Sequence, residues 1–191
     1  MTSYFQMYET ALLLAITSHK GQFRKGTSIP YIVHPVHVSN ILSTHGFREE
    51  VVVAGLLHDV VEDNDVTVKQ IEQIFGRQVS EIINVVTEKK YDVNGKVLAW
   101  EIRRKDSLRK LREGNISAIA VKVADVYHNA ATLLFELQDK GSDVWLRFNA
   151  KPHMIVKNYK DVCMLGFEQL DCAKMVDRLS NVIIQLEQFS T

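Results

Sequence analysis

The sequence predicts an all-α protein folded as a single-domain helical bundle. Only 3 of its 191 residues are proline and 9 are glycine, which is too few for the many turns of a β-sandwich. Apolar residues recur mostly at the three- and four-residue spacing of a helix buried on one side. This length suits one domain, taken here as residues 1–191. A chain of this size buries roughly 70% of its unfolded surface, so it needs no disulfide or metal to fold.

Start and stop signals divide the chain into helices. Ser3 with Gln6 and Thr67 with Gln70 form two predicted capping boxes, which open helices, and Pro35 takes the favoured first position of another. Glycines, polar loops and the apolar period between them set the other boundaries. The predicted helices cover, in order, residues 4–20, 35–45, 48–62, 68–75, 79–86, 96–112, 116–137, 143–158 and 161–188.

Two segments leave helix and strand both open. Residues 51–57 are almost continuously apolar, so periodicity alone does not exclude a strand. The length of the surrounding pattern and its flanking acidic residues favour a buried helix. Residues 119–123 alternate between larger and smaller side chains, a weak strand signal, before the composition becomes helical. An all-α fold requires helices at both places.

Charge and composition exclude several classes of protein. Lys+Arg and Asp+Glu are both 23, and this zero net charge argues against a protein that coats DNA or RNA. The longest apolar runs fall far short of the ~20 residues that cross a bilayer, and the first residues do not resemble a secretory signal. Cys163 and Cys172 lack metal-ligand spacing and are interpreted as reduced thiols of a cytoplasmic protein, with a single bridge as the alternative. We expect neither nucleic acid nor membrane as a partner.

The most informative segment follows the apolar stretch and reads His58-Asp59-Val60-Val61-Glu62-Asp63. On a continuous helix, a spacing of four places His58 above Glu62 and Asp59 above Asp63. Four ionisable side chains at the end of a buried element are costly unless they are paired, and a divalent cation would offset that cost. The alternative is that the helix simply emerges into solvent here.

Two further residues weaken that alternative. His34 follows an apolar segment at a helix start, and Asp125 ends another apolar run, although a helix cap or a satisfied core polar group would also account for either. With His58 and Asp59 they supply two imidazoles and two carboxylates from three elements. This mixed set of nitrogen and oxygen suits an exchangeable octahedral ion such as Mn²⁺ better than a closed structural zinc.

A set of motifs occurs in order between about residues 10 and 137. They are His19-Lys20-Gly21-Gln22-Phe23-Arg24-Lys25, Pro30-Tyr31-Ile32-Val33-His34-Pro35, Leu56-Leu57-His58-Asp59-Val60-Val61-Glu62-Asp63, Phe75-Gly76, Val86-Thr87, and Lys122-Val123-Ala124-Asp125 with Asn129. Together they resemble the hydrolase domain of RelA/SpoT-type proteins, an HD-domain family. The residues after Leu137 are too few for the synthetase and regulatory domains of long members, so the chain is similar to the small stand-alone alarmone hydrolases.

The resemblance implies a metal-dependent pyrophosphohydrolase with an HD-domain fold. It implies removal of the 3′-pyrophosphate of guanosine tetra- or pentaphosphate, which gives GDP or GTP and pyrophosphate. One divalent ion per chain, usually Mn²⁺, would be held by His34, His58, Asp59 and Asp125. Glu62 and Asp63 would orient and deprotonate the attacking water. The side chains that would face the guanosine nucleotide are Arg24, Lys25, Asn129 and Thr132.

The charges of the site predict nearby cationic side chains, independently of the family resemblance. Two carboxylate ligands neutralise a divalent ion, and Glu62 with Asp63 then leaves the pocket negative, so an anionic nucleotide needs nearby positive charge. Each candidate would otherwise be a solvated surface charge. The candidates are Lys20, Arg24, Lys25, Lys122, Arg147 and Lys151, with Arg103 and Arg104 on a basic helix face as residues to test for phosphate contact.

Two departures from the family leave the substrate open. Val126 and Ala131 stand where the family usually has a basic residue and often an arginine. The same metal chemistry on another phosphorylated nucleotide, such as the 2′-phosphate of NADPH, is therefore one alternative. A catalytically silent alarmone-binding module is another, although binding alone does not need the charges of Glu62 and Asp63. The sequence leaves open whether the chain forms a homo-oligomer.

Overall fold

The computed structural model describes residues 3–190 apart from 64–65, and for Asp63 it describes the backbone alone. Within this part the regular structure is helical, with two isolated β-bridges and no strand, so the predicted all-α class is confirmed. The elements are α1 (Tyr4–Ser18), α2 (Val33–Thr44), α3 (Glu49–Leu57), α4 (Val60–Asp63), α5 (Val68–Phe75), α6 (Arg77–Val86), α7 (Trp100–Glu113), α8 (Ile116–Lys140), the 3₁₀ helix η1 (Ser142–Arg147), α9 (Pro152–Gln169) and α10 (Ala173–Glu187).

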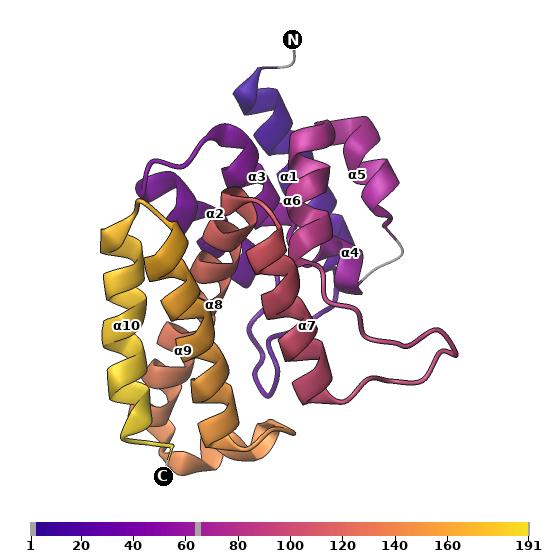
Figure 1. Ribbon diagram of the computed structural model, residues 1–191. Helices are drawn as coiled ribbons and strands as arrows, with labels where there is room; N and C mark the ends of the chain where they lie inside the picture. The colour runs from indigo at the N-terminus through magenta and orange to yellow at the C-terminus, as the bar shows by residue number, and fades with distance from the viewer. Residues whose placement is uncertain (1–2, 64–65, 191) are drawn as a thin grey trace.

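Helix α8 is the centre of the fold. It packs against α2, α3 and α6 in the N-terminal half and against α9 and α10 in the C-terminal half (Figure 1). Because neighbours cover it on several sides, residues 118–121 are all buried. This burial explains why the apolar pattern at 119–123 does not follow a simple helical period, and why the weak strand signal there was wrong.

Helices α2 and α3 pack closely, and this brings their ends together. All residues from 51 to 57 are buried, and Gly55 faces α2. A Cβ atom at Gly55 would collide with the side chain of Leu42, which is fully buried. The absence of a side chain at Gly55 therefore allows the close packing of α2, which carries His34, against α3, which ends directly before His58.

The predicted helix over 48–62 is wrong at one point. The structure ends α3 at Leu57 and begins α4 at Val60, with a turn at 58–59 between them. The His58 ring nitrogen Nδ1 lies 2.8 Å from the Gly55 carbonyl, which an uninterrupted helix would bond to the backbone N–H of Asp59. The side chain thus competes for a backbone acceptor at the point where the helix stops.

Other boundaries were partly right. Both predicted capping boxes are present, whereas α2 begins at Val33, two residues before Pro35. The predicted helix over 143–158 is a 3₁₀ turn followed by α9, which opens with Pro152 and continues past the predicted break to Gln169. Among the described residues, no helix has both the length and the apolar content that crossing a lipid bilayer requires.

Candidate metal centre

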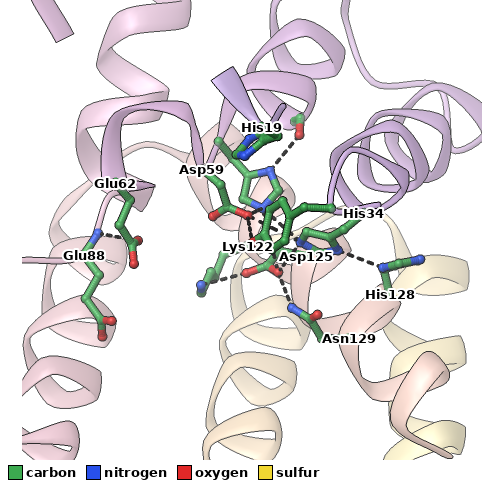
Figure 2. A network of polar contacts seen from close by, with 12 residues as sticks. His19, His34, Asp59, Glu62, Glu88, Lys122, Asp125, His128 and Asn129 are labelled. Carbon is green, nitrogen blue, oxygen red and sulfur yellow. Dashed lines mark hydrogen bonds and ion pairs between the residues drawn. The ribbon is translucent and has the colours of Figure 1, made fainter. Parts of the chain in front are cut away.

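Three separate parts of the fold bring the four predicted ligands together. His34 lies in the first turn of α2, His58 and Asp59 form the turn after α3, and Asp125 lies on α8. Figure 2 shows the labelled members of this set directed toward one another. His34, His58 and Asp125 are buried, and the Asp59 side chain is 17% exposed. The cluster is therefore nearly closed to solvent, with Asp59 its most accessible member.

The carboxylate oxygens of Asp59 and Asp125 lie close to the imidazole nitrogens of His34 and His58. The Nε2 atoms of His34 and His58 are 3.2 Å apart. Asp59 Oδ2 is 3.0 Å from His58 Nε2 and 3.7 Å from His34 Nε2, and Asp125 Oδ1 is 3.9 Å and 3.3 Å from the same two atoms. Atoms that each lie ~2.1 Å from one ion, in neighbouring positions, are about 3.0–3.5 Å apart. His34, His58 and Asp59 form a group that could hold a divalent cation, and Asp125 Oδ1 lies within 3.9 Å of both imidazole nitrogens.

If an ion were bound, hydrogen bonds would determine which nitrogen of each imidazole carries a proton. His58 Nδ1 must donate its proton to the Gly55 carbonyl, 2.8 Å away, because a carbonyl only accepts. His34 Nδ1 lies 2.8 Å from His128 Nδ1, and this contact requires one proton between two nitrogens. For His34 Nε2 to accept a cation, His34 Nδ1 must carry that proton and His128 must accept it.

Other side chains orient the two carboxylates. The Tyr31 hydroxyl donates to Asp59 Oδ2 at 2.7 Å. Lys122 donates to Asp125 Oδ2 at 2.7 Å, and Asn129 donates to Asp125 Oδ1 at 2.6 Å. With the Lys122 bond on Oδ2, the other oxygen of Asp125 is the one closest to the imidazoles. Such outer partners fix the direction of ligand lone pairs.

Burial and charge shift the pKa values of the cluster in opposite directions. Burial alone would lower the pKa of His58, but the Asp59 carboxylate outweighs it and raises that pKa to about 9. Burial opposes ionisation of Asp59, yet the His58 imidazolium holds the pKa of Asp59 below its usual range. Burial lowers the pKa of His34, although Asp125 opposes the shift. Without an ion, a proton therefore resides on His58 beside Asp59.

Glu62, one of the two predicted water-activating residues, lies at one side of the cluster (Figure 2). Glu62, on α4, accepts a hydrogen bond from the Glu88 backbone N–H at 3.2 Å and pairs with Lys90 at 3.4 Å. Burial raises the pKa of Glu62, and the charge of Asp59 adds to the shift. A carboxylate with a raised pKa is a better proton acceptor. The side chain of Asp63 lies outside the described part of the chain.

Two of the predicted nucleotide-facing residues adjoin the metal cluster. Arg24 donates to Asn129 Oδ1 at 2.6 Å, and its guanidinium lies over the Tyr31 ring, 5.7 Å from the centroid. Asn129 in turn holds Asp125. Thr132 donates its hydroxyl to the His128 carbonyl of its own helix, at 2.9 Å.

Two more of the predicted cations, Lys25 and Arg147, lie around one aromatic ring. Lys25 Nζ is 5.9 Å and Arg147 Cζ is 4.9 Å from the centroid of Phe148. Arg147 also pairs with Glu136 through both guanidinium nitrogens of its fork. The structure therefore places Lys25 and Arg147 together at Phe148 and gives Arg147 an internal counter-ion.

Sequence reasoning gave no role to three residues that contact the site. Tyr31 holds Asp59, His128 holds His34, and Glu88 contacts Glu62. His128 lies three residues after Asp125 on the same helix, a spacing that shares a face and was a usable signal. Glu88 offers no such signal, because it is 26 residues from Glu62.

The chain matches a known family and its relatives. A family model described as HD domain matches residues 11–154. The bifunctional (p)ppGpp synthase/hydrolase SpoT of Escherichia coli is 38% identical over 125 residues, which are 64% of this chain and 17% of that protein. The chain thus spans less than a fifth of the length of the curated relatives it matches, between 15% and 18% of each.

Two solved structures share the fold. A crystal structure from Listeria monocytogenes has a TM-score of 0.71 and 30% identity, and the match covers 81% of this chain and 99% of that one. A metazoan orthologue of SpoT, described as hydrolysing ppGpp, has a TM-score of 0.73 and 25% identity, and the match covers 97% of both chains.

Proposed function

The chain belongs to the HD-domain family, and from this premise we propose that it hydrolyses the 3′-pyrophosphate of guanosine tetra- or pentaphosphate in a Mn²⁺-dependent reaction. The products are GDP or GTP and pyrophosphate. The observation that carries the proposal is the convergence of two imidazole nitrogens and two carboxylate oxygens, with Glu62 on the helix that follows. The names of the Escherichia coli and metazoan proteins support the class of substrate.

The four ligands divide the work of holding the ion. His34 and His58 would bind through Nε2, and Asp59 and Asp125 through Oδ2 and Oδ1. A divalent ion bound there supplies a Lewis acid for the phosphate and lowers the pKa of water. Mixed nitrogen and oxygen ligands with open positions suit Mn²⁺.

The remaining residues handle the proton and the nucleotide. The water oxygen bonds to the phosphorus nearest the 3′ oxygen. The bond between that phosphorus and the 3′ oxygen breaks, and the 3′ oxygen gains a proton. Glu62 would accept the proton of the attacking water, a role that its raised pKa favours. Arg24 would meet the guanine base or a phosphate with its flat cation, while Lys25 and Arg147 would meet phosphates from the side of Phe148.

A second candidate keeps this chemistry and changes the nucleotide, for example to the 2′-phosphate of NADPH. It is favoured by the departure from the family at Ala131. Val126 is 3% exposed and belongs to the core, so the missing basic residue there removes no surface charge from the site. Ala131 is half-buried on α8, two residues after Asn129, and offers only a methyl group.

An assay of the purified protein with Mn²⁺ tests both candidates. The panel contains guanosine tetraphosphate, guanosine pentaphosphate, NADPH and GTP, and the products are separated by anion-exchange chromatography. We expect pyrophosphate from the first two nucleotides, loss of this activity in Asp125→Ala, and unchanged activity in Asp177→Ala, which alters an exposed aspartate of α10. Phosphate release from NADPH alone would indicate NADPH as the substrate in place of the guanosine nucleotides. No hydrolysis of any compound would favour the catalytically silent alarmone-binding module.

A further inference from the structure

Glu88 is a buried acidic residue outside the metal cluster. It follows α6 at the start of the loop that leads to α7, and it is 8% exposed. Acidic side chains are rarely this buried without a partner, because removing a carboxylate from water is costly. Figure 2 shows it beside Glu62, on the side of the cluster opposite His128.

The segment that begins at Glu88 holds both oxygens of the Glu62 carboxylate. The Glu88 backbone N–H donates to Glu62 Oε2 at 3.2 Å. The Lys90 ammonium lies 3.4 Å from Glu62 Oε1 and donates to the Glu62 backbone carbonyl at 3.3 Å. The direction of the Glu62 carboxylate therefore depends on the position of residues 88–90.

Two arginines of α7 hold the Glu88 side chain. Arg103 donates to Glu88 Oε2 at 3.0 Å, and Arg104 lies 3.7 Å from Glu88 Oε1. The arginine side chains are 20% and 29% exposed, so water screens these pairs less than it screens a surface pair. Removal of one partner from such a buried pair leaves an uncompensated charge. The two residues that the sequence marked for phosphate contact are counter-ions of Glu88.

We propose that Glu88 is a positioning residue for Glu62. Its carboxylate, clamped by Arg103 and Arg104, fixes the start of the α6–α7 loop so that the Glu88 N–H and Lys90 meet the two oxygens of Glu62. This inference rests on the proposed function, in which Glu62 accepts the proton of the attacking water. A base that turns away from its water loses rate without any change in how the ion is held.

The test is a double-mutant cycle on the Mn²⁺-loaded protein. The variants are Glu88→Gln, Glu62→Gln and the two combined, and Glu101→Gln on the exposed side of α7 is the matched control. Glutamine at position 88 keeps the size of the side chain and the backbone N–H but removes the charge that holds two arginines. Single-turnover rate, Michaelis constant and Mn²⁺ affinity are measured for each, together with amide hydrogen exchange of residues 88–90.

Glu88→Gln is expected to lower the single-turnover rate by about 10–10²-fold and to speed amide exchange at residues 88–90, with the Michaelis constant and Mn²⁺ affinity unchanged. In the Glu62→Gln background the same substitution should have no further effect, because the residue it positions is gone. Additive losses, or a fall in Mn²⁺ affinity, would overturn the inference and leave Glu88 a general stabilising residue.

Failure of the proposed function gives a different result. A wild-type protein that hydrolyses none of the nucleotides removes the chemical role of Glu62. The contact itself is then decided by amide exchange, which does not depend on activity. Unchanged exchange at residues 88–90 in folded Glu88→Gln would show that the arginine clamp does not hold this segment, and the positioning role would be wrong.

Discussion

His34 and His58 direct the same ring nitrogen into the same cluster, but different kinds of group hold them there. The Nδ1 atom of His58 bonds a backbone carbonyl, that of Gly55. The Nδ1 atom of His34 bonds a side chain, the imidazole of His128. Both contacts measure 2.8 Å. Two imidazoles with the same proposed role in the site are thus supported by groups of different chemistry.

The two acceptors differ in whether their ability to accept a hydrogen bond can be lost. A carbonyl accepts a hydrogen bond at every pH, and no side-chain substitution removes it. An imidazole accepts only while its nitrogen is unprotonated. Burial, followed by electrostatic interaction with His34 and Arg24, lowers the pKa of His128 to about 3, so His128 stays neutral and able to accept. The orientation of His34 therefore depends on one replaceable side chain, and that of His58 does not.

Removal of either histidine should have the largest effect on Mn²⁺ binding. His34→Ala and His58→Ala should each weaken Mn²⁺ binding by about three orders of magnitude or more, because a metal bond is lost and buried partner groups are left unpaired. Titration calorimetry and elemental analysis measure the effect, with the exposed His153→Ala as a control. Retention of one ion per chain in either variant would remove that histidine from the coordination shell.

The support of His34 can be broken without touching a ligand. His128→Leu fills this buried position with a side chain that cannot accept a hydrogen bond, so Mn²⁺ affinity should fall about 10–100-fold. His37→Ala is the control, because the His37 ring only stacks on His128, with centroids 4.9 Å apart. Equal affinities in wild type and His128→Leu would mean that His34 needs no fixed partner.

Protonation distinguishes the two histidines at neutral pH. With its pKa raised to about 9, His58 carries a proton that an ion must displace, whereas the lowered pKa of His34 leaves it neutral. Binding near pH 7.5 should release about one proton, and affinity should rise about tenfold per pH unit up to pH 9. Calorimetry in buffers of different ionisation enthalpy measures the release, and a value of zero would contradict the charged His58–Asp59 pair.

The same shift has a consequence for the metal-free fold. The folded pKa of His58 lies above its ordinary value of 6.5, so the protonated form is the one that the fold stabilises. Its contribution is complete below pH 6.5 and is lost as the pH rises through 9. In thermal unfolding of the metal-free protein, the stabilisation that His58 contributes should therefore fall over this pH range. His58→Gln should remove that fall.

The sequence was sufficient to predict the fold class and to predict that the four side chains lie close together. Each of His34, His58 and Asp125 adjoins an apolar run, and buried elements must meet in one core. That these side chains bind an ion stays a prediction. The break at His58 was not predictable from periodicity, because it depends on a side chain competing with the backbone for the Gly55 carbonyl.

Contacts between distant segments were beyond the sequence. Nothing in its spacing distinguishes Arg103 and Arg104 from a solvated basic face, and only the tertiary structure supplies Glu88 as their counter-ion. The same holds for Lys25 and Arg147, which converge on Phe148 from different segments. Apolar patterns determine which faces are buried, whereas the choice of polar partner depends on the packing of those faces.

The central claim is that one bound ion and Glu62 together hydrolyse the nucleotide, and Glu62→Gln tests it most directly. Glutamine keeps the size and the acceptor for the Glu88 N–H but removes the basicity, and Glu72→Gln on the exposed face of α5 is the control. Binding calorimetry and single-turnover hydrolysis are run on the same Mn²⁺-loaded sample. We expect one ion per chain with turnover reduced by roughly 10²–10⁴-fold. Unchanged hydrolysis would contradict the claim, and loss of the ion would move Glu62 into the coordination shell.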